Sequence, residues 1–182
     1  VIADAKRGDI GNTSYQYSRA ILETMGCDAI TISPYMGRDA IEPFLEDTKK
    51  GVFILAMTSN RGAAEIQNNE NDAIPLYERV VHIACELNQN DNVGLVVGAT
   101  NIDVMTKIRK ISQGLSWLIP GVGAQGGDLK QSVSISNQKG VGVVNISRAI
   151  LYSGSGSMDD IIKSAKNYTE QIRKIVCNPI TC

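Results

Sequence analysis

The sequence predicts an α/β protein built on parallel strands, and three observations carry that prediction. Six short apolar runs rich in β-branched residues recur along the chain, and helical patterns fill most of the gaps between them. Most of the runs are continuous rather than alternating, as in parallel strands that are covered on both faces. Nearly every run ends in polar or glycine-rich sequence, which favours a (β/α)8 TIM barrel over an open doubly wound sheet, because all barrel loops meet at one rim.

Six βα units cannot close an eight-stranded barrel. We therefore interpret residues 1–182 as a single TIM-barrel domain of which the six C-terminal βα units are visible. Two further units, about fifty residues, are expected upstream of Val1. Val1 itself lies inside the first apolar run, although chain termini normally lie exposed, and this agrees with missing upstream residues.

Each element has its own local signal. The strands are expected at 1–5, 29–33, 52–57, 93–98, 117–120 and 141–146. The helices are expected at 13–25, at 41–50, from 75 onward, at 100–111 and at 157–176. Gly26 would end the first helix, and Pro75 suits the first turn of the third. Thr100 begins a sequence that resembles a capping box, and Ser157 is a good N-cap for the last helix.

Composition excludes several classes of function. Eighteen basic and nineteen acidic residues leave a formal charge of −1, so neither a nucleic-acid partner nor a membrane surface has electrostatic support. No apolar run approaches the roughly 18–20 residues that span a bilayer. The four cysteines show no CxxC spacing and look like reduced thiols rather than a zinc site or a disulfide framework. We expect a cytoplasmic enzyme.

The first candidate for chemistry is the charge cluster Asp4, Lys6 and Asp9. On a strand, side chains two apart point to the same side, so Asp4 and Lys6 face together, and Asp9 falls just past the strand end. Carboxylate, ammonium and carboxylate at a strand's C-terminal end form a candidate active site. The alternative is a solvated ion pair, which is usually worth little.

Two later segments provide groups that could bind a ligand. Ser59 and Asn60 lie at the end of the third visible strand. A hydroxyl there could donate or accept a hydrogen bond at the amide-like edge of a heterocycle. The glycine-rich segment 120–128 allows close backbone approach and is expected to point several N–H groups inward. Gln125 within it and Arg148 after the sixth strand suggest a phosphate site, which barrel enzymes often build from their last two units.

Other candidates are weaker. His82 is the only histidine and lies mid-helix among apolar residues, which indicates packing or solvent contact rather than catalysis. Trp117 at a strand start is expected in the core. No nucleophile elbow, Ser-His pair or metal-ligand cluster is found, so no metal is predicted.

Together these motifs resemble the orotidine 5′-phosphate decarboxylase family, in its longer-chain type 2 branch. The resemblance runs from Val1 to about Leu151. The corresponding motifs, in order, are DAKRGDIGNT at 4–13, TSN at 58–60, PGVGAQGGD at 120–128, and Ser147-Arg148. The D-x-K-x-x-D pattern is shared with sugar-phosphate relatives, so the flanking sequence and the glycine-rich loop make the match specific.

The resemblance implies a role for each residue of the first motif. Lys6 would donate a proton to C6 of the pyrimidine, and Asp4 would lie beside the departing carboxylate and help to position Lys6. Asp9, accompanied by Ile10 and Thr13, would reach into the site of a partner subunit. An obligate homodimer is therefore implied.

The resemblance also implies the substrate contacts. Ser59 would contact the pyrimidine, and Gln125 and Arg148 would hold the 5′-phosphate. Pro120 and Ser147 belong to the same substrate-binding motifs.

The implied activity is cofactor-free conversion of orotidine 5′-phosphate to UMP and CO2 in pyrimidine biosynthesis. The family also needs an Asp and a Lys on its first two strands, which are expected upstream of Val1.

Two alternatives to this activity remain open. One is a Mg2+-dependent sugar-phosphate decarboxylase or aldolase of the same superfamily, and the other is a catalytically inactive phosphate-binding domain.

Overall fold

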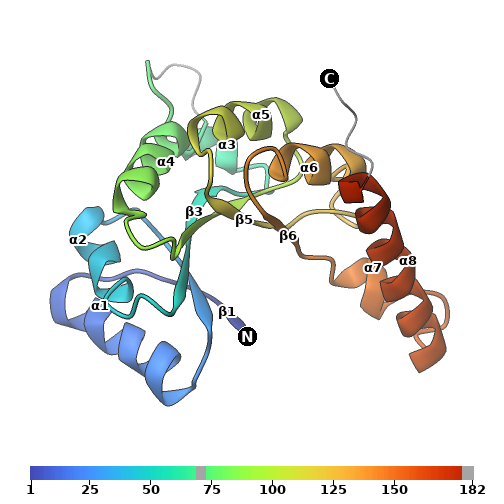
Figure 1. Cartoon of the computed structure of the whole chain (residues 1–182), viewed down its shortest axis with the longest axis horizontal. Helices are drawn as coiled ribbons and strands as arrows, with labels where there is room; N and C mark the ends of the chain where they lie inside the picture. Colours follow the sequence, from blue (N-terminus) through green and yellow to red (C-terminus); the bar gives the residue numbers. More distant parts are fainter. Residues whose placement is uncertain (69–72, 178–182) are drawn as a thin grey trace.

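The sheet of this protein is curved, parallel and covered by helices on its outer side (Figure 1). The computed structural model describes residues 1–68 and 73–177. Its strands follow the order β1-β2-β3-β4-β5-β6, and every neighbouring pair is parallel. Each strand lies beside the next one along the chain, as consecutive βα units require. The predicted barrel architecture with six visible units is thereby confirmed.

All six predicted strands are present, with ends that differ by at most two residues. β2 and β4 are buried along their whole length, whereas β1 and β6 at the two edges of the sheet are more exposed. This difference explains why the continuous apolar runs predicted the central strands so well. The strands are β1 (Ile2–Arg7), β2 (Ala29–Ile32), β3 (Gly51–Met57), β4 (Val93–Val97), β5 (Ser116–Ile119) and β6 (Gly142–Val144).

The helices vary more in length and type. The region after β1 starts as an α-helix and continues as a π-helix. The region after β2 contains only two short helical segments, of four and three residues. The helical elements are α1 (Gly11–Ser18), π-helix η1 (Arg19–Thr24), α2 (Arg38–Ile41), 3-10 helix η2 (Glu42–Phe44), α3 (Ala63–Ile66), α4 (Leu76–Leu87), α5 (Ile102–Ile111), α6 (Leu129–Ser136), α7 (Arg148–Leu151) and α8 (Met158–Cys177).

Two local predictions were wrong. The helix expected at 41–50 ends instead at Phe44, because the fully buried Phe44 anchors a single 3-10 turn and the chain then folds into further turns. The N-cap of α5 is Asn101 rather than Thr100, since the Asn101 side chain accepts a 3.0 Å hydrogen bond from the Val104 N–H. The cap at Ser157 is confirmed by its 3.2 Å hydrogen bond from the Asp160 N–H.

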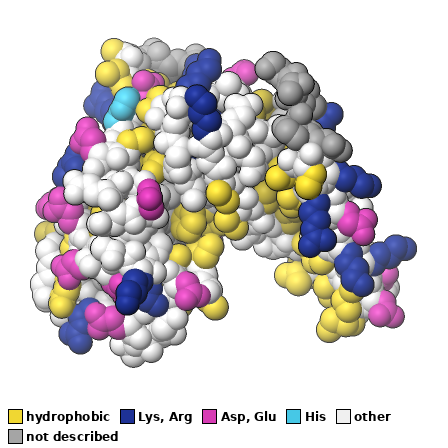
Figure 2. Space-filling model, in the orientation of Figure 1, with side chains coloured by type: hydrophobic (Ala, Val, Ile, Leu, Met, Phe, Trp, Pro, Cys, Tyr) yellow, Lys and Arg dark blue, Asp and Glu magenta, His cyan; other side chains and the backbone are white. Residues whose placement is uncertain are grey.

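Buried apolar side chains form two layers. The larger layer packs the outer face of the sheet against the helices and contains Trp117, which is fully buried as predicted. A smaller cluster covers the concave face, where Figure 2 shows hydrophobic side chains in the hollow of the molecule. Its members are Ala29, Phe53, Val96 and Leu118, with Ile2 and Leu55 packed against them. This inner layer forms the floor beneath the candidate site.

Candidate active site

A cleft of about 450 Å³ lies at the carboxyl ends of the strands. Parallel strands present these ends at one edge, so residues from distant parts of the sequence meet there. The apolar floor comes from β3, β4 and β5, and the polar groups come from β1 and the loops. The lining residues are Asp4, Lys6, Leu55, Thr58, Ser59, Asn60, Val96, Leu118, Pro120, Gln125 and Asn145.

The charged part of the cleft is the Asp4–Lys6 pair on β1. Lys6 Nζ lies 2.5 Å from Asp4 Oδ1, as their same-side placement predicts. Both side chains are about half exposed, at 49% for Lys6 and 60% for Asp4, so a ligand can reach them. Within the described cleft they are the only charged side chains.

The strand carrying this pair is irregular. Ala3 pairs with Ile30 but Arg7 pairs with Ile32, so four steps along β1 match only two along β2. Lys6 has φ of 48°, a left-handed conformation that is uncommon for residues with a side chain. Bulges and backbone outliers of this kind concentrate at active sites.

The ionisation of Asp4 is set by its neighbours. Partial burial by itself would raise the pKa of Asp4, but hydrogen bonds from Lys6 and Thr31 and the charge of Lys6 hold that pKa below its ordinary value. Asp4 is therefore a carboxylate at neutral pH, and it lies beside the Lys6 amine.

Ser59 and Gln125 meet across the cleft. The Ser59 hydroxyl donates a 2.6 Å hydrogen bond to Gln125 Oε1. The Gln125 amide NH2 has no hydrogen-bond partner among residues 1–68 and 73–177, so it can donate to a ligand. Gly121 permits this approach, because its φ is 98° and a Cβ there would lie 3.0 Å from both Gln125 Oε1 and Ser59 Cβ. The glycine-rich loop thus joins the two predicted binding segments.

The backbone of that loop is less available than the sequence suggested. The Gly126 N–H donates to the Gly123 carbonyl, and the Gly127 N–H donates to the Gly121 carbonyl. These two groups are used inside the loop and cannot bind a ligand, so the expectation that several N–H groups point inward was wrong for them.

A second amide group lies at the end of β6. Asn145 lines the cleft, and its Oδ1 accepts a 3.0 Å hydrogen bond from the Ser147 hydroxyl. Ser147 therefore affects the cleft through Asn145, although it does not line the cleft itself. Arg148 follows at the first position of α7 and is exposed, also outside the cleft lining.

The remaining predicted residues lie around the start of α1, where Asp9 is partly buried. Asp9 Oδ1 accepts from the Ile10 N–H at 2.8 Å, and the Asp9 carbonyl accepts from the Ser14 hydroxyl at 2.6 Å. Ile10 is 63% exposed and Thr13 is exposed as well. None of these three predicted residues lines the cleft of its own chain.

Some residues of the site were missed at the level of sequence. Thr31 hydrogen-bonds both the Asp4 carboxylate and the Lys6 backbone, and Gln67 hydrogen-bonds the Thr58 N–H at 2.8 Å and the Thr58 hydroxyl at 2.9 Å. The signal available for Thr31 was a hydroxyl in an otherwise apolar strand. Nothing local indicated Gln67 or Asn145.

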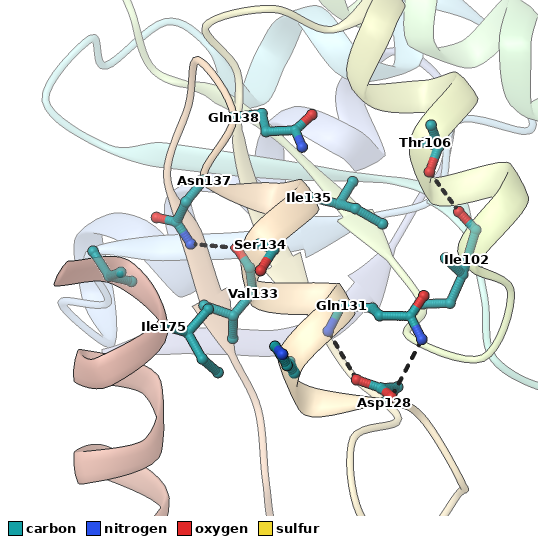
Figure 3. Close-up of a pocket in the computed structure, with 12 residues that line it drawn as sticks. Ile102, Thr106, Asp128, Gln131, Val133, Ser134, Ile135, Asn137, Gln138 and Ile175 are labelled. Atoms are coloured by element: carbon teal, nitrogen blue, oxygen red, sulfur yellow. Dashed lines mark hydrogen bonds between the residues drawn. The ribbon is translucent and has the colours of Figure 1, made fainter. Parts of the chain in front are cut away.

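A larger hollow of about 850 Å³ lies between helices α5, α6 and α8 (Figure 3). Its one carboxylate, Asp128, caps α6 by accepting from the Gln131 N–H at 2.8 Å. The Thr106 hydroxyl is used within α5, where it donates to the Ile102 carbonyl at 2.9 Å. Because these polar groups are engaged in helix structure, the smaller cleft is the better candidate for chemistry.

The other sequence candidates stay outside the site. His82 is exposed on α4 and does not line the cleft. Within residues 1–68 and 73–177, no three His, Cys, Asp or Glu side chains gather as a metal site would require. Among the helices in this described part of the chain, none is long and apolar enough to cross a membrane.

Comparison with known proteins gives consistent results at the level of sequence. A family model described as "Orotidine 5′-phosphate decarboxylase / HUMPS family" matches residues 1–169. Orotidine 5′-phosphate decarboxylase of Haloarcula marismortui is 46% identical over 184 residues, which cover 96% of this chain and 66% of the relative. The enzyme of Dehalococcoides mccartyi shows the same identity and coverage over 181 residues. The chain thus spans just under two thirds of the length of these curated relatives.

Solved structures show the same fold. The structure of Leishmania donovani OMP decarboxylase matches with a TM-score of 0.86 at 36% identity, covering 96% of this chain and 68% of that chain. Orotidine 5′-monophosphate decarboxylase of Methanocaldococcus jannaschii, complexed with the inhibitor BMP, matches with a TM-score of 0.76 at 26% identity and covers 94% and 73%.

Proposed function

Because the chain belongs to the orotidine 5′-phosphate decarboxylase / HUMPS family, we propose that it carries the active site of an orotidine 5′-phosphate decarboxylase. The substrate is orotidine 5′-phosphate and the products are UMP and CO2. The observation that carries the proposal is the Lys6 ammonium, held 2.5 Å from Asp4 in the same cleft as Ser59 and Gln125. The curated relatives named above and the inhibitor-bound structure support a small-molecule substrate of this class.

The proposed step begins with cleavage of the bond between C6 and the carboxylate. CO2 leaves, and the electron pair stays on C6 as a vinyl carbanion that no adjacent π-system delocalises. A fixed ammonium group stabilises the negative charge that develops on C6, and we assign this role to the Lys6 ammonium. Lys6 Nζ then transfers a proton to C6 to give UMP, and solvent reprotonates the amine. No external oxidant or reductant is consumed.

The surroundings of Lys6 support this role. Asp4 Oδ1 holds Lys6 Nζ by a 2.5 Å contact, so the proton donor has a defined place in the cleft. The apolar floor formed by Leu55, Val96 and Leu118 lowers the local dielectric constant, which strengthens the attraction between the ammonium and a developing carbanion. We assign the Asp4 carboxylate a place beside the departing substrate carboxylate.

Substrate binding is assigned to the opposite side of the cleft. We assign Ser59 to the pyrimidine and the free amide NH2 of Gln125 to the 5′-phosphate, with Arg148 as a bidentate partner of the phosphate. Pro120 and Ser147 complete the proposed binding surface of this chain, and Ile10 and Thr13 are assigned to the substrate site of the partner subunit. Phosphate contacts far from C6 supply binding energy that is realised in the transition state.

The proposal includes a homodimer. Asp9, with Ile10 and Thr13, would act in the neighbouring subunit's site. This is supported by the exposure of Ile10 and Thr13 and by the position of all three residues outside the cleft of their own chain. Ile10, an apolar side chain that is 63% exposed, is the kind of residue that a subunit interface covers.

A cytoplasmic location is also proposed. Cys27, Cys85 and Cys177 are free thiols, and cysteines stay reduced in the cytoplasm.

Turnover without added metal tests the reaction. The protein that carries this sequence is incubated with orotidine 5′-phosphate in the presence of EDTA, and UMP formation is followed by chromatography. We expect full activity with the chelator, and we expect Lys6→Ala to lose several orders of magnitude in kcat while still binding UMP. The matched control is Lys107→Ala, because Lys107 is exposed on α5 and does not line the cleft.

The alternatives give different results in the same assay. A requirement for Mg2+, together with no binding of UMP, would support the sugar-phosphate enzyme instead. Binding of UMP by calorimetry without any turnover would support an inactive phosphate-binding domain. Undiminished turnover by Lys6→Ala would contradict the role given to Lys6.

A further inference from the structure

Thr31 is a polar residue at the centre of an apolar strand. It lies in β2, between Ile30 and Ile32, and its side chain is completely buried. A buried hydroxyl must find hydrogen-bond partners, because leaving one unpaired is costly. Both partners of this hydroxyl belong to the candidate active site.

The strand opposite Thr31 is the irregular part of β1. Since Ala3 pairs with Ile30 and Arg7 pairs with Ile32, the segment between them faces Thr31 as a bulge without regular pairing. Lys6 lies in this bulge with φ of 48°, so its backbone N–H is outside the regular ladder. That N–H donates instead to the Thr31 hydroxyl at 3.0 Å.

The same hydroxyl also reaches Asp4. Thr31 Oγ1 donates a 2.9 Å hydrogen bond to Asp4 Oδ1, the oxygen that the Lys6 ammonium contacts at 2.5 Å. One oxygen atom therefore joins the backbone of Lys6 to the carboxylate that holds the Lys6 side chain. Thr31 is β-branched, which restricts its χ1 angle and fixes the direction of the hydroxyl.

We propose that Thr31 is a positioning residue for the Lys6–Asp4 pair. Its hydroxyl holds the Lys6 backbone in the left-handed conformation and fixes the Asp4 carboxylate, so that the ammonium occupies one place in the cleft. The consequence for turnover rests on the proposed function, because it assumes that Lys6 protonates C6. The effect on Asp4 and on the Lys6 backbone does not depend on that assumption.

A matched pair of substitutions separates the hydroxyl from the rest of the side chain. Thr31→Val keeps the β-branched shape and removes the hydroxyl, whereas Thr31→Ser keeps the hydroxyl and removes the methyl group. Thr106→Val is the control, because the Thr106 hydroxyl bonds the Ile102 carbonyl within α5, away from the cleft. Circular dichroism and thermal unfolding establish that each variant folds.

The kinetic readout distinguishes positioning from binding. In Thr31→Val we expect kcat to fall on the order of 10- to 100-fold with KM changed less than about threefold, because a misplaced catalytic group slows the chemical step. Thr31→Ser should recover most of kcat, and Thr106→Val should match the wild type. Wild-type kcat in Thr31→Val, or equal loss in Thr31→Ser and Thr31→Val, would overturn the proposal.

A second readout does not need turnover. The pKa of Asp4 is measured by NMR from its carboxyl carbon, and we expect it to be higher in Thr31→Val than in the wild type or in Thr31→Ser, because one hydrogen bond to the carboxylate is lost. Lys6 is the only charged side chain among the described cleft residues that faces Asp4. Arg7 stacks on the Tyr17 ring, and Asp28 pairs with the amino group of Val1. An unchanged Asp4 pKa in Thr31→Val would count against the proposal.

Hydrogen exchange of the wild type covers the case in which Thr31→Val does not fold. The Lys6 amide should exchange slowly even though it lies outside the strand ladder, because the Thr31 hydroxyl binds it. Exchange at the rate of an exposed loop amide would overturn the proposal. A wild-type protein without turnover but with a protected Lys6 amide would refute the proposed function and leave the role of Thr31 supported.

Discussion

The Ser59 hydroxyl donates a 2.6 Å hydrogen bond to the side-chain carbonyl of Gln125, although the two residues are 66 positions apart in sequence. Ser59 follows β3 and Gln125 lies in the glycine-rich loop after β5, so the contact joins the two halves of the proposed substrate site. It also sets which end of the Gln125 amide faces the ligand, because the carbonyl is occupied and the NH2 is free.

This contact predicts that Ser59 and Gln125 act as one unit in ligand binding. UMP affinity is measured by calorimetry for Ser59→Ala, Gln125→Ala and the double variant. The double variant should lose less than the sum of the single losses, with a coupling of about 1 kcal/mol. Gln125→Ala combined with Ser134→Ala on α6 is the control and should be additive. Additivity of Ser59 and Gln125 would show that they bind independently.

The proposed exchange of Asp9 between subunits predicts complementation. Lys6→Ala and Asp9→Ala should each be inactive as pure proteins. After mixing and subunit exchange, about a quarter of the wild-type activity should return, because half of the dimers are mixed and each mixed dimer has one intact site. Mixing Lys6→Ala with Asp4→Ala is the control and should restore nothing, since both residues serve the same subunit's site. Failure to recover activity in the first mixture would contradict a shared site.

Arg109 is predicted to be a large contributor to stability. Arg109 is 3% exposed, and its guanidinium stacks 3.8 Å from the centre of the Trp117 ring. The same group donates to the carbonyls of Ser112, Leu115 and Ser136. Burial lowers its pKa to about 10, so it remains charged at neutral pH. Arg109→Met leaves those carbonyls, near the ends of α5 and α6, without their donor.

We expect Arg109→Met to lower the free energy of unfolding by about 3 kcal/mol, since hydrogen bonds from a charged donor are worth more than neutral ones. Urea unfolding followed by circular dichroism measures this change. Arg173→Met, at an exposed position of α8, is the control and should stay within about 0.5 kcal/mol of the wild type. A loss below about 1 kcal/mol in Arg109→Met would contradict the structural role of Arg109.

Asp128 predicts a dependence of stability on pH. The pKa of its carboxyl is held below the ordinary value, chiefly by the hydrogen bond from the Gln131 N–H at the start of α6. A carboxylate whose pKa is lower in the folded state stabilises the protein above its unfolded-state pKa. That contribution is lost as the pH falls through the lower, folded-state pKa. Asp128 therefore adds stability at neutral pH that acid removes.

Two substitutions test this prediction by urea unfolding at neutral and acidic pH. Asp128→Ala should cost about 1 kcal/mol at neutral pH, because the N-cap is lost. Asp128→Asn should keep the cap and lose less stability than the wild type on acidification, because it cannot be protonated. Glu170→Gln, exposed on α8, is the control at neutral pH. Identical acid sensitivity in Asp128→Asn and the wild type would contradict the assignment.

Local sequence patterns were enough to predict the strands of this fold and the residues of its charged motif. Continuous β-branched runs are a local property of buried parallel strands, and all six predictions from them are confirmed. The spacing of Asp4 and Lys6 predicted that the two side chains meet, and they do. Helix ends were less predictable: Phe44 stops a helix through burial against distant residues, and no local signal reports that.

The contacts that hold the site together arise from folding and could not be predicted from local patterns. The Thr31 hydroxyl reaches Lys6 across 25 positions of sequence, and the Ser59 hydroxyl reaches Gln125 across 66. Arg109 closes two helix ends at once because β5 and α6 pack beside it. A side chain's own neighbours in sequence bias the secondary structure that it adopts. Its hydrogen-bond partners, however, depend on which strands the sheet brings together, and no local pattern contains that information.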